Sequence, residues 1–213
     1  MQTQVQAQAQ KATTTEESPV VQEKIKRLRE LYGDAPGVGK VALQKGLSDI
    51  KRELAAATTT GVQSAGRIGA RQGKVSELTA ILPLAKGGAK RIRGLLELTE
   101  GNFKAADIVG TLHDMRFVFL DNDTRLLFAT AYDGEWDAYI DDFVTKIPTS
   151  MDLFFCNLEG WPGIHSPSIK DWLVQHQISA DAWYVANPNL TVAETRRLEK
   201  LGKAADEFLD EVA

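Results

Sequence analysis

The side chains best suited to chemistry in this sequence are its histidines, His113, His165 and His176. A neutral imidazole can act as a general base or bind a metal ion. His165 stands in a loop rich in Gly and Pro, beside Trp161, and loops on a rigid sheet often carry function. His176 is expected near the end of a helix, where a cation is favoured, so a capping role is its alternative. No two histidines have metal-ligand spacing, so metal binding would depend on their proximity in the fold.

His113 and Arg116 belong to the segment TLHDMRFVFL, which is typical of a β-strand. Strict alternation places His113 on the same face as Met115, and Asp114 and Arg116 on the opposite face. His113 is then either a functional side chain or a hydrogen-bonded histidine of the core or its rim. Asp114 and Arg116 could form a structural ion pair at a dimer interface, or Arg116 could orient an anionic ligand such as a carboxylate.

Aromatic residues follow the expected strands and the nearby loops, which indicates either a site for an apolar ligand or simply the core. The candidate catalytic residues are His113, Arg116 and His165. The candidate ligand-binding residues are Phe117, Phe128, Tyr132, Trp161 and Trp183. Cys156 lies on an apolar segment and is expected to be buried and inert.

Composition restricts the class of protein. The chain has 213 residues, of which 43% are hydrophobic and 25% charged, as is ordinary for a soluble globular domain with or without an appendage. A single cysteine excludes an intramolecular disulfide and a cysteine-based zinc site. No stretch approaches the roughly 18 apolar residues of a spanning helix, and the N-terminus lacks the features of a secretory signal. We therefore expect a cytoplasmic protein with no membrane partner.

The net charge of −4 is distributed unevenly. Residues 40–93 contain eleven basic and three acidic residues, whereas residues 94–213 contain nine basic and twenty-one acidic residues. Such asymmetry indicates an anionic partner or attraction between parts of an assembly. No aromatic residue accompanies the basic ones between Lys40 and Arg93, which argues against nucleic acid as the partner.

The chain divides by pattern into three parts. Residues 1–17 are rich in Gln and lack aromatic residues, which predicts a disordered tail. Residues 18–73 predict a helical arm of two amphipathic helices and a linker of small residues. Residues 74–213 predict an α+β domain with a ferredoxin-like β-α-β-β-α-β core, followed by a C-terminal helix, strand and helix. The expected core strands are 75–84, 111–120, 125–132 and 151–158, with a hairpin turn at residues 121–123, and the later strand is ADAWYVA. A helix is expected from Gly134 until Pro148 ends it, and the last helix is expected to turn its apolar residues inward, among them Leu198 and Leu201.

The element order over residues 75–157 resembles the dimeric α+β barrel superfamily. The segments TLHDMRFVFL, RLLFATAYDGEWDAYIDDF and AWYVANPNLTV are similar to those of bacterial members of unsettled function. The resemblance implies a homodimer in which two ferredoxin-like sheets close into a barrel, with a ligand in or beside it. It also implies oxygenase- or peroxidase-like chemistry, cofactor-free or haem-dependent. If haem binds, His165 or His176 is the expected iron ligand.

Two functions follow as hypotheses. The first is a small-ligand-binding barrel, with oxidoreductase chemistry, that takes a small hydrophobic or aromatic molecule. The second is a non-enzymatic assembly protein whose helices within residues 18–60 dock to a protein partner.

Overall fold

The computed structural model describes residues 19–56, 62–101 and 103–212. The tail expected over residues 1–17 and the first part of the linker, Thr58 to Gly61, lie outside these residues. By its contacts the chain forms two units, Met1–Thr59 and Thr60–Ala213, and each is described by itself. In the part of the chain that is described, no helix has the length and apolar character needed to cross a membrane.

The first unit contains two helices, α1 (Pro19–Leu31) and α2 (Gly37–Ala56), as the pattern predicts. A proline at the first position starts α1, because its missing N–H would have no partner there. Ile25 of α1 and Leu47 of α2 are buried. Other apolar side chains of this unit are exposed: Val20, Leu31, Val38 and Val41.

The second unit is built on an open antiparallel sheet, in the strand order β1-β2-β3-β5-β4 with β6 paired to β3. The strands are β1 (Gln63–Ser64), β2 (Ala70–Gln72), β3 (Val75–Pro83), β4 (Leu112–Leu120), β5 (Arg125–Asp133) and β6 (Gln177–Ile178). The central strand β3 pairs with β5 along its whole length, and β5 pairs with β4. The expected turn between β4 and β5 is confirmed, and Asp121, Asn122 and Asp123 all have positive φ there.

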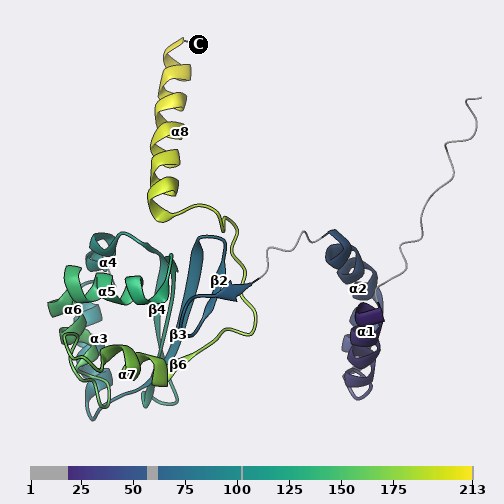
Figure 1. Ribbon diagram of the computed structural model, residues 1–213, viewed down its shortest axis with the longest axis horizontal. Helices are drawn as coiled ribbons and strands as arrows, with labels where there is room; N and C mark the ends of the chain where they lie inside the picture. The colour runs from purple at the N-terminus through teal and green to yellow at the C-terminus, as the bar shows by residue number, and fades with distance from the viewer. Residues whose placement is uncertain (1–18, 57–61, 102, 213) are drawn as a thin grey trace, which may run out of the picture. The chain divides into compact units, whose positions relative to one another are not determined.

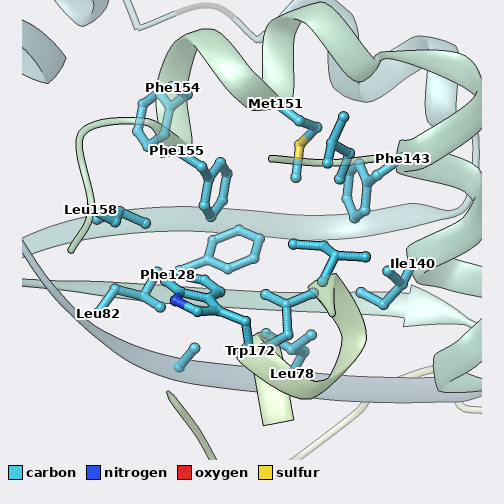
Figure 2. Packing of buried hydrophobic residues seen from close by; sticks show 14 of the residues in the cluster. Leu78, Leu82, Phe128, Ile140, Phe143, Met151, Phe154, Phe155, Leu158 and Trp172 are labelled. Carbon is cyan, nitrogen blue, oxygen red and sulfur yellow. The ribbon is translucent and has the colours of Figure 1, made fainter. Parts of the chain in front are cut away.

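Six helices complete the second unit: α3 (Gly88–Leu98), α4 (Lys104–Val109), α5 (Trp136–Lys146), α6 (Pro148–Phe155), α7 (Ile169–His176) and α8 (Val192–Val212). Helices α4, α5 and α6 lie on one side of the sheet (Figure 1). Figure 2 shows the side chains of Phe143, Met151 and Phe155 pointing from these helices toward the sheet, where Phe128 and Leu78 meet them. The fold is therefore mixed α+β, with the core between one sheet face and the helices.

The fourth expected core strand, residues 151–158, is wrong, because most of this segment is helix α6. Pro148 stands in the first turn of α6, so it starts a new helix as well as ending the previous one. The buried Met151, Phe154 and Phe155 have helical spacing, and a short apolar run does not distinguish strand from helix. Only Leu158 joins the sheet, through an isolated bridge to Leu84 of the chain beyond β3.

Four further expectations are corrected by the structure. The segment ADAWYVA forms no strand, and residues 62–73, expected to be linker, contribute β1 and β2. The apolar stripe of the last helix is not turned inward, because only Val192 of α8 is buried. Cys156 is exposed, since it follows α6 rather than standing in a strand. The ferredoxin-like dimeric barrel stays a prediction.

The hairpin of β1 and β2 docks closely on the rest of the unit. The backbone N–H of Trp136 donates to the Ala65 carbonyl at 2.9 Å, and the Gln177 amide donates to the Ile68 carbonyl at 2.8 Å. Gly69, with φ of 103°, passes so near β3 that a Cβ atom there would lie 2.4 Å from the carbonyl oxygen of Glu77. This approach requires glycine.

We predict that Gly69→Ala lowers the free energy of unfolding by about 1–3 kcal/mol, because the new methyl group clashes with backbone and the conformation is left-handed. The matched control is Gly94→Ala in α3, where a Cβ atom would meet nothing within 4 Å. That change should raise stability by roughly 0.5–1 kcal/mol, since alanine is the better helix former. Urea denaturation followed by circular dichroism measures both. Equal stability of the Gly69 variant and the parent would contradict the close docking.

Candidate functional site

An apolar cleft opens between the end of α3, the start of α4 and helix α6. Its outer part has a volume of about 560 Å³. An inner part of about 80 Å³ lies next to it on the side of the sheet, and the two share Phe103, Ala105, Ser150 and Phe154 in their walls. We call the two parts together the apolar cleft. The outer part is further lined by Leu95, Leu96, Leu98, Thr99, Glu100, Lys104 and Leu153, and the inner part by Ala106, Met115, Phe117, Phe128, Phe143, Ile147, Met151 and Phe155.

The connection between α3 and α4 gives the cleft its shape. Helix α3 is capped at Thr99, and Glu100 and Gly101 follow with φ of 52° and 69°. These left-handed residues reverse the chain, so α4 begins at Lys104 and Phe103 lies over the sheet. The ring of Phe103 lies 5.5 Å from that of Phe117, centroid to centroid.

The floor of the cleft is a cluster of aromatic rings. The centroid of Phe117 lies 4.4 Å from that of Phe154 and 5.0 Å from that of Phe128, on which it stacks. Offset and tilted arrangements of this kind are favourable for aromatic rings, and the rings give the floor an apolar surface. Among the described lining residues only Glu100 and Lys104 carry a charge, and both lie in the outer part. The walls are therefore apolar, with the charged groups near the opening.

Two of the five predicted ligand-binding residues, Phe117 and Phe128, line the cleft. Tyr132 does not: it is buried and stacks on Tyr139 with centroids 3.8 Å apart. Burial, and then the nearby carboxylate of Glu77, raise the pKa of Tyr132 well above its ordinary value, so it stays neutral.

The two predicted tryptophans lie elsewhere. The indole N–H of Trp161 donates to Asp152 Oδ1 at 2.8 Å, and its ring lies 5.1 Å from that of Trp172. This arrangement fixes the loop that follows α6. The carbonyl of Trp183 accepts a hydrogen bond from the Gln72 side chain at 2.8 Å, which holds the irregular segment after β6 beside β2. Both residues have structural contacts outside the apolar cleft.

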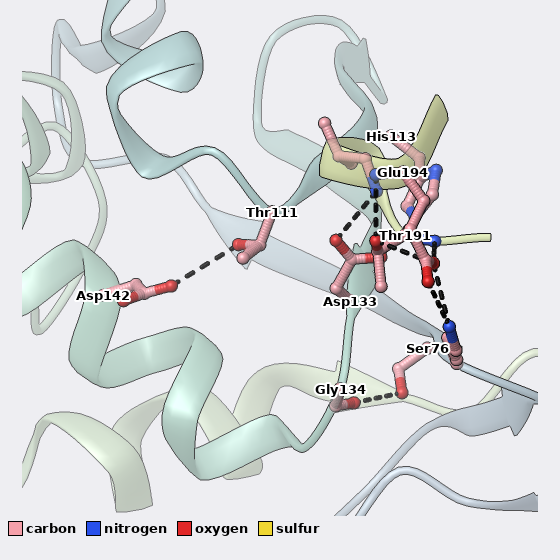
Figure 3. Close-up of polar contacts among 10 residues, drawn as sticks. Ser76, Thr111, His113, Asp133, Gly134, Asp142, Thr191 and Glu194 are labelled. Carbon is pink, nitrogen blue, oxygen red and sulfur yellow. Dashed lines mark hydrogen bonds and ion pairs between the residues drawn. The ribbon is translucent and has the colours of Figure 1, made fainter. Parts of the chain in front are cut away.

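His113 forms a carboxylate–imidazole pair with Asp133, with Nε2 2.7 Å from Oδ1 (Figure 3). The expectation that it shares a face with Met115 is wrong. A β-bulge between Leu112 and Asp114 inserts His113 as an extra residue, so that Leu112 and Met115 both pack on the core. An alternating sequence pattern does not reveal an inserted residue. The bulge places the imidazole of His113 at the edge of the sheet.

The three predicted catalytic residues have separate surroundings. Arg116 donates to Asp114 at 3.0 Å on the exposed surface of β4, and the dimer interface that the sequence suggested for this ion pair stays a prediction. His165 is exposed in the loop before α7. No contact found in the described part of the chain joins His113, Arg116 and His165, and none of them lines the apolar cleft.

The candidate iron ligands do not fit a haem in the cleft. A ring nitrogen of His176 lies 2.8 Å from the Trp172 carbonyl, and the ring lies 4.3 Å from the indole of Trp172. Neither His165 nor His176 lines the cleft. Across residues 19–56, 62–101 and 103–212, no group of three His, Cys, Asp or Glu side chains is arranged to hold a metal ion.

A polar cluster that the sequence did not predict fixes the start of α8. We call it the α8 anchor: Lys74, His113, Asp133, Thr191 and Glu194 (Figure 3). Asp133 Oδ2 accepts the first helical N–H, from Val192, at 3.0 Å, while its other oxygen contacts His113. Thr191 and Glu194 form a reciprocal capping box, and Lys74 Nζ lies 2.7 Å from Glu194 Oε1. The sequence signal was present, since Thr-x-x-Glu is a capping-box motif.

The α8 anchor makes the first turn of α8 sensitive to acid. The hydrogen bond from Lys74, then those from Thr191, lower the pKa of Glu194 from 4.5 to about 2. Because the folded value is the lower one, the stabilisation is complete above pH 4.5 and is lost as the pH falls toward 2. We predict that the protection of the amides at Val192–Thr195, which is their intrinsic exchange rate at the same pH relative to the rate measured by NMR, falls over this range.

The matched control for the acid response is Lys74→Ala, which removes the largest cause of the shift. In this variant the Glu194 carboxyl should titrate closer to its ordinary pKa, and the fraying of α8 should begin at higher pH. A Glu194 carboxyl that titrates near 4.5 in the unaltered folded chain would contradict the anchor as described.

Comparison with known proteins finds no match to this chain among protein-family models, curated proteins or solved structures. The resemblance to the dimeric α+β barrels therefore stays a prediction from the sequence. Function must be argued from the cleft, the sheet and the helices themselves.

Proposed function

We propose that the protein binds a small apolar or aromatic molecule in the apolar cleft. The observation that carries the proposal is the cleft itself, whose outer part of about 560 Å³ adjoins an inner pocket floored by Phe117 and Phe128. Sites for small molecules commonly have volumes of about 300–1,000 Å³ and apolar walls with a few polar groups. The volume of the outer part lies in this range, and the walls are apolar with a few polar groups.

The walls specify the kind of ligand. An aromatic or branched aliphatic group would enter the inner part and contact Phe103, Phe117 and Phe154. The outer part offers Lys104 Nζ, Glu100 and the hydroxyls of Thr99 and Ser150. A molecule with an apolar body and one polar end therefore suits the cleft best.

The function proposed for the cleft is binding rather than catalysis. Its described lining contains no histidine, cysteine or arginine, and its two charged residues are at the opening. General acid–base catalysis needs a titratable group within hydrogen-bond reach of the reacting atom.

Oxidoreductase chemistry, with or without haem, stays a prediction from the resemblance. Its test is absorbance after addition of haemin, where a Soret band that His165→Ala or His176→Ala abolishes would support it.

We predict that Ala105→Trp weakens ligand binding, because Ala105 lines both parts of the cleft and an indole would fill the passage between them. The probe is 1-anilinonaphthalene-8-sulfonate, which has an apolar body and one anionic end. Its affinity, measured by fluorescence titration, should fall by about tenfold or more, equivalent to ~1.4 kcal/mol.

The matched control is Ile108→Trp on the same helix, α4, which is exposed and does not line the cleft. It should leave the probe affinity unchanged, and thermal unfolding of both variants should confirm that each is folded. Equal probe affinity in the parent chain and the Ala105 variant would contradict the proposed site.

The dimer implied by the resemblance has a candidate surface on the open face of the sheet. There Ile81 of β3 pairs with Leu127 of β5, and Leu127 pairs with Val118 of β4, in one apolar row. Ile81 and Leu127 are only half-buried and Val118 is exposed. We propose that a second copy of the chain covers this row, as the closing of two sheets into a barrel requires.

We predict that Val118→Arg halves the particle mass measured by light scattering, because it places a charge in the apolar row. The matched control is Ile108→Arg, which substitutes another exposed apolar residue, on the helical side of the sheet. An unchanged mass in the Val118 variant would exclude the open face as an interface.

Exposed apolar side chains support the assembly function expected of residues 18–60. Val20, Leu31, Val38 and Val41 expose 63%, 64%, 79% and 52% of their surface, which is unusual for so many apolar residues of one short unit. A protein that docks on this arm would cover them.

A further inference from the structure

Helix α8 presents an amphipathic surface that the rest of its unit leaves uncovered. It is fixed at its start by the α8 anchor and extends away from the sheet (Figure 1). From Arg196 to Val212 every residue is exposed, including Leu198, Leu201 and Phe208, at 52%, 53% and 62%. An apolar stripe of this length in water indicates a partner.

The stripe has the spacing of a helix-pairing seam. Its residues follow one another at alternating intervals of three and four, which is the a/d pattern of a coiled coil. These residues are Leu198, Leu201, Ala205, Phe208 and Val212. The partner of such a seam is another helix with the same repeat, and α8 of a second copy has it by identity.

The charges of α8 are segregated along its length. The first half after the anchor carries Arg196, Arg197, Lys200 and Lys203, with Glu199 as the one acid. The second half carries only acids, Asp206, Glu207, Asp210 and Glu211. Within the helix Lys203 and Glu207 approach to 3.9 Å, and Arg196 pairs with Asp107 of α4 at 2.8 Å. Two copies side by side can therefore match opposite charges in one orientation alone.

We propose that α8 pairs with α8 of a second copy in antiparallel orientation. In this arrangement Leu198 packs against Phe208 of the partner subunit, and Leu201 packs against Ala205 of the partner subunit. Arg197 and Glu211 of the partner subunit flank the seam as an ion pair, which occurs twice by symmetry. Gly202, whose Cβ position is open, stands near the two-fold axis and allows the backbones to approach.

The parallel alternative is disfavoured by the same residues. It would place the basic halves together and the acidic halves together, which costs electrostatic energy. Its flanking positions would bring Arg197 to Gly202 and Ala204 to Leu209, so no opposite charges would meet. The antiparallel seam spans only two heptads, so we expect a weak dimer with Kd in roughly the micromolar range.

Cysteine cross-linking in the full chain tests the orientation. Cys156→Ser removes the native exposed thiol, and Ala204→Cys then places one thiol beside the proposed axis. Mild oxidation should give a covalent dimer well above the background of the native chain, whose only thiol is Cys156. Leu198→Cys should not cross-link, because the two copies of that position would lie about 15 Å apart along the axis, beyond disulfide reach.

Cross-linking at Leu198→Cys but not at Ala204→Cys would overturn the proposal in favour of a parallel pair. If cross-linking at both positions is no higher than the background, at protein concentrations up to about 1 mM, self-pairing of α8 is overturned. The stripe would then belong to a different partner. The cross-link reports on α8 whatever other surface joins the copies, so its failure is distinct from failure of the open-face dimer or of the cleft.

Charge exchange gives an independent test. One variant carries Glu207→Lys, Asp210→Lys and Glu211→Lys, and the other carries Arg197→Glu, Lys200→Glu and Lys203→Glu. Each, combined with Cys156→Ser and Ala204→Cys, should cross-link at least about tenfold less than the parent, while an equimolar mixture should restore the covalent dimer. No restoration in the mixture would overturn the electrostatic part of the proposal.

Discussion

The second unit depends on a buried carboxylate that is held by hydrogen bonds. Glu77, on the central strand, exposes only 3% of its surface. It accepts hydrogen bonds from the N–H groups of Ala70 and Ala180, at 3.0 and 3.2 Å, and from the Thr79 hydroxyl at 2.9 Å. A buried carboxylate is costly unless it is fully hydrogen-bonded, so the hairpin, β3 and the segment after β6 must meet at this point.

The position of α8 follows from that meeting of three segments. The chain leaves Ala180 beside Glu77 and runs along β2, where the Lys74 N–H donates to the Pro188 carbonyl at 2.7 Å. It reaches the end of β5 at Asp133, whose carboxylate receives the first N–H of α8. The helix is therefore directed by the sheet and not by packing of its own apolar stripe.

The sequence predicts most helices and strands of the second unit better than it predicts which residues pack against them. Long segments with clear periodicity, such as β3, β4, β5 and α5, occur where expected, because one face of each is strongly apolar. The bulge at His113 and the helical start at Pro148 depend on local geometry that alternation does not encode. The segment ADAWYVA has the residues of a strand, yet it contacts β2 through a hydrogen bond from the Gln72 side chain to the Trp183 carbonyl and not through a strand ladder.

The candidate site was predictable only in part, for a similar reason. Phe117 and Phe128 were expected at a ligand because strands of the sheet carry them, and they form the floor of the cleft. The walls come from the turn at Glu100 and from the end of α6, and no motif marks either. Tyr132 stands on the same strand as Phe128, but the stacked ring of Tyr139 covers it.

Strand β4 restricts how copies of this chain can meet. Strand β4 ends the sheet, and an unpaired strand edge offers its backbone groups to any other strand. Here the bulge at His113 interrupts that edge, and Asp114 and Arg116 place charges along it. The pairing of β4 with a strand of another copy is therefore disfavoured, and so is the formation of continuous intermolecular sheets. Copies of the chain can instead form closed pairs through a sheet face or a helix.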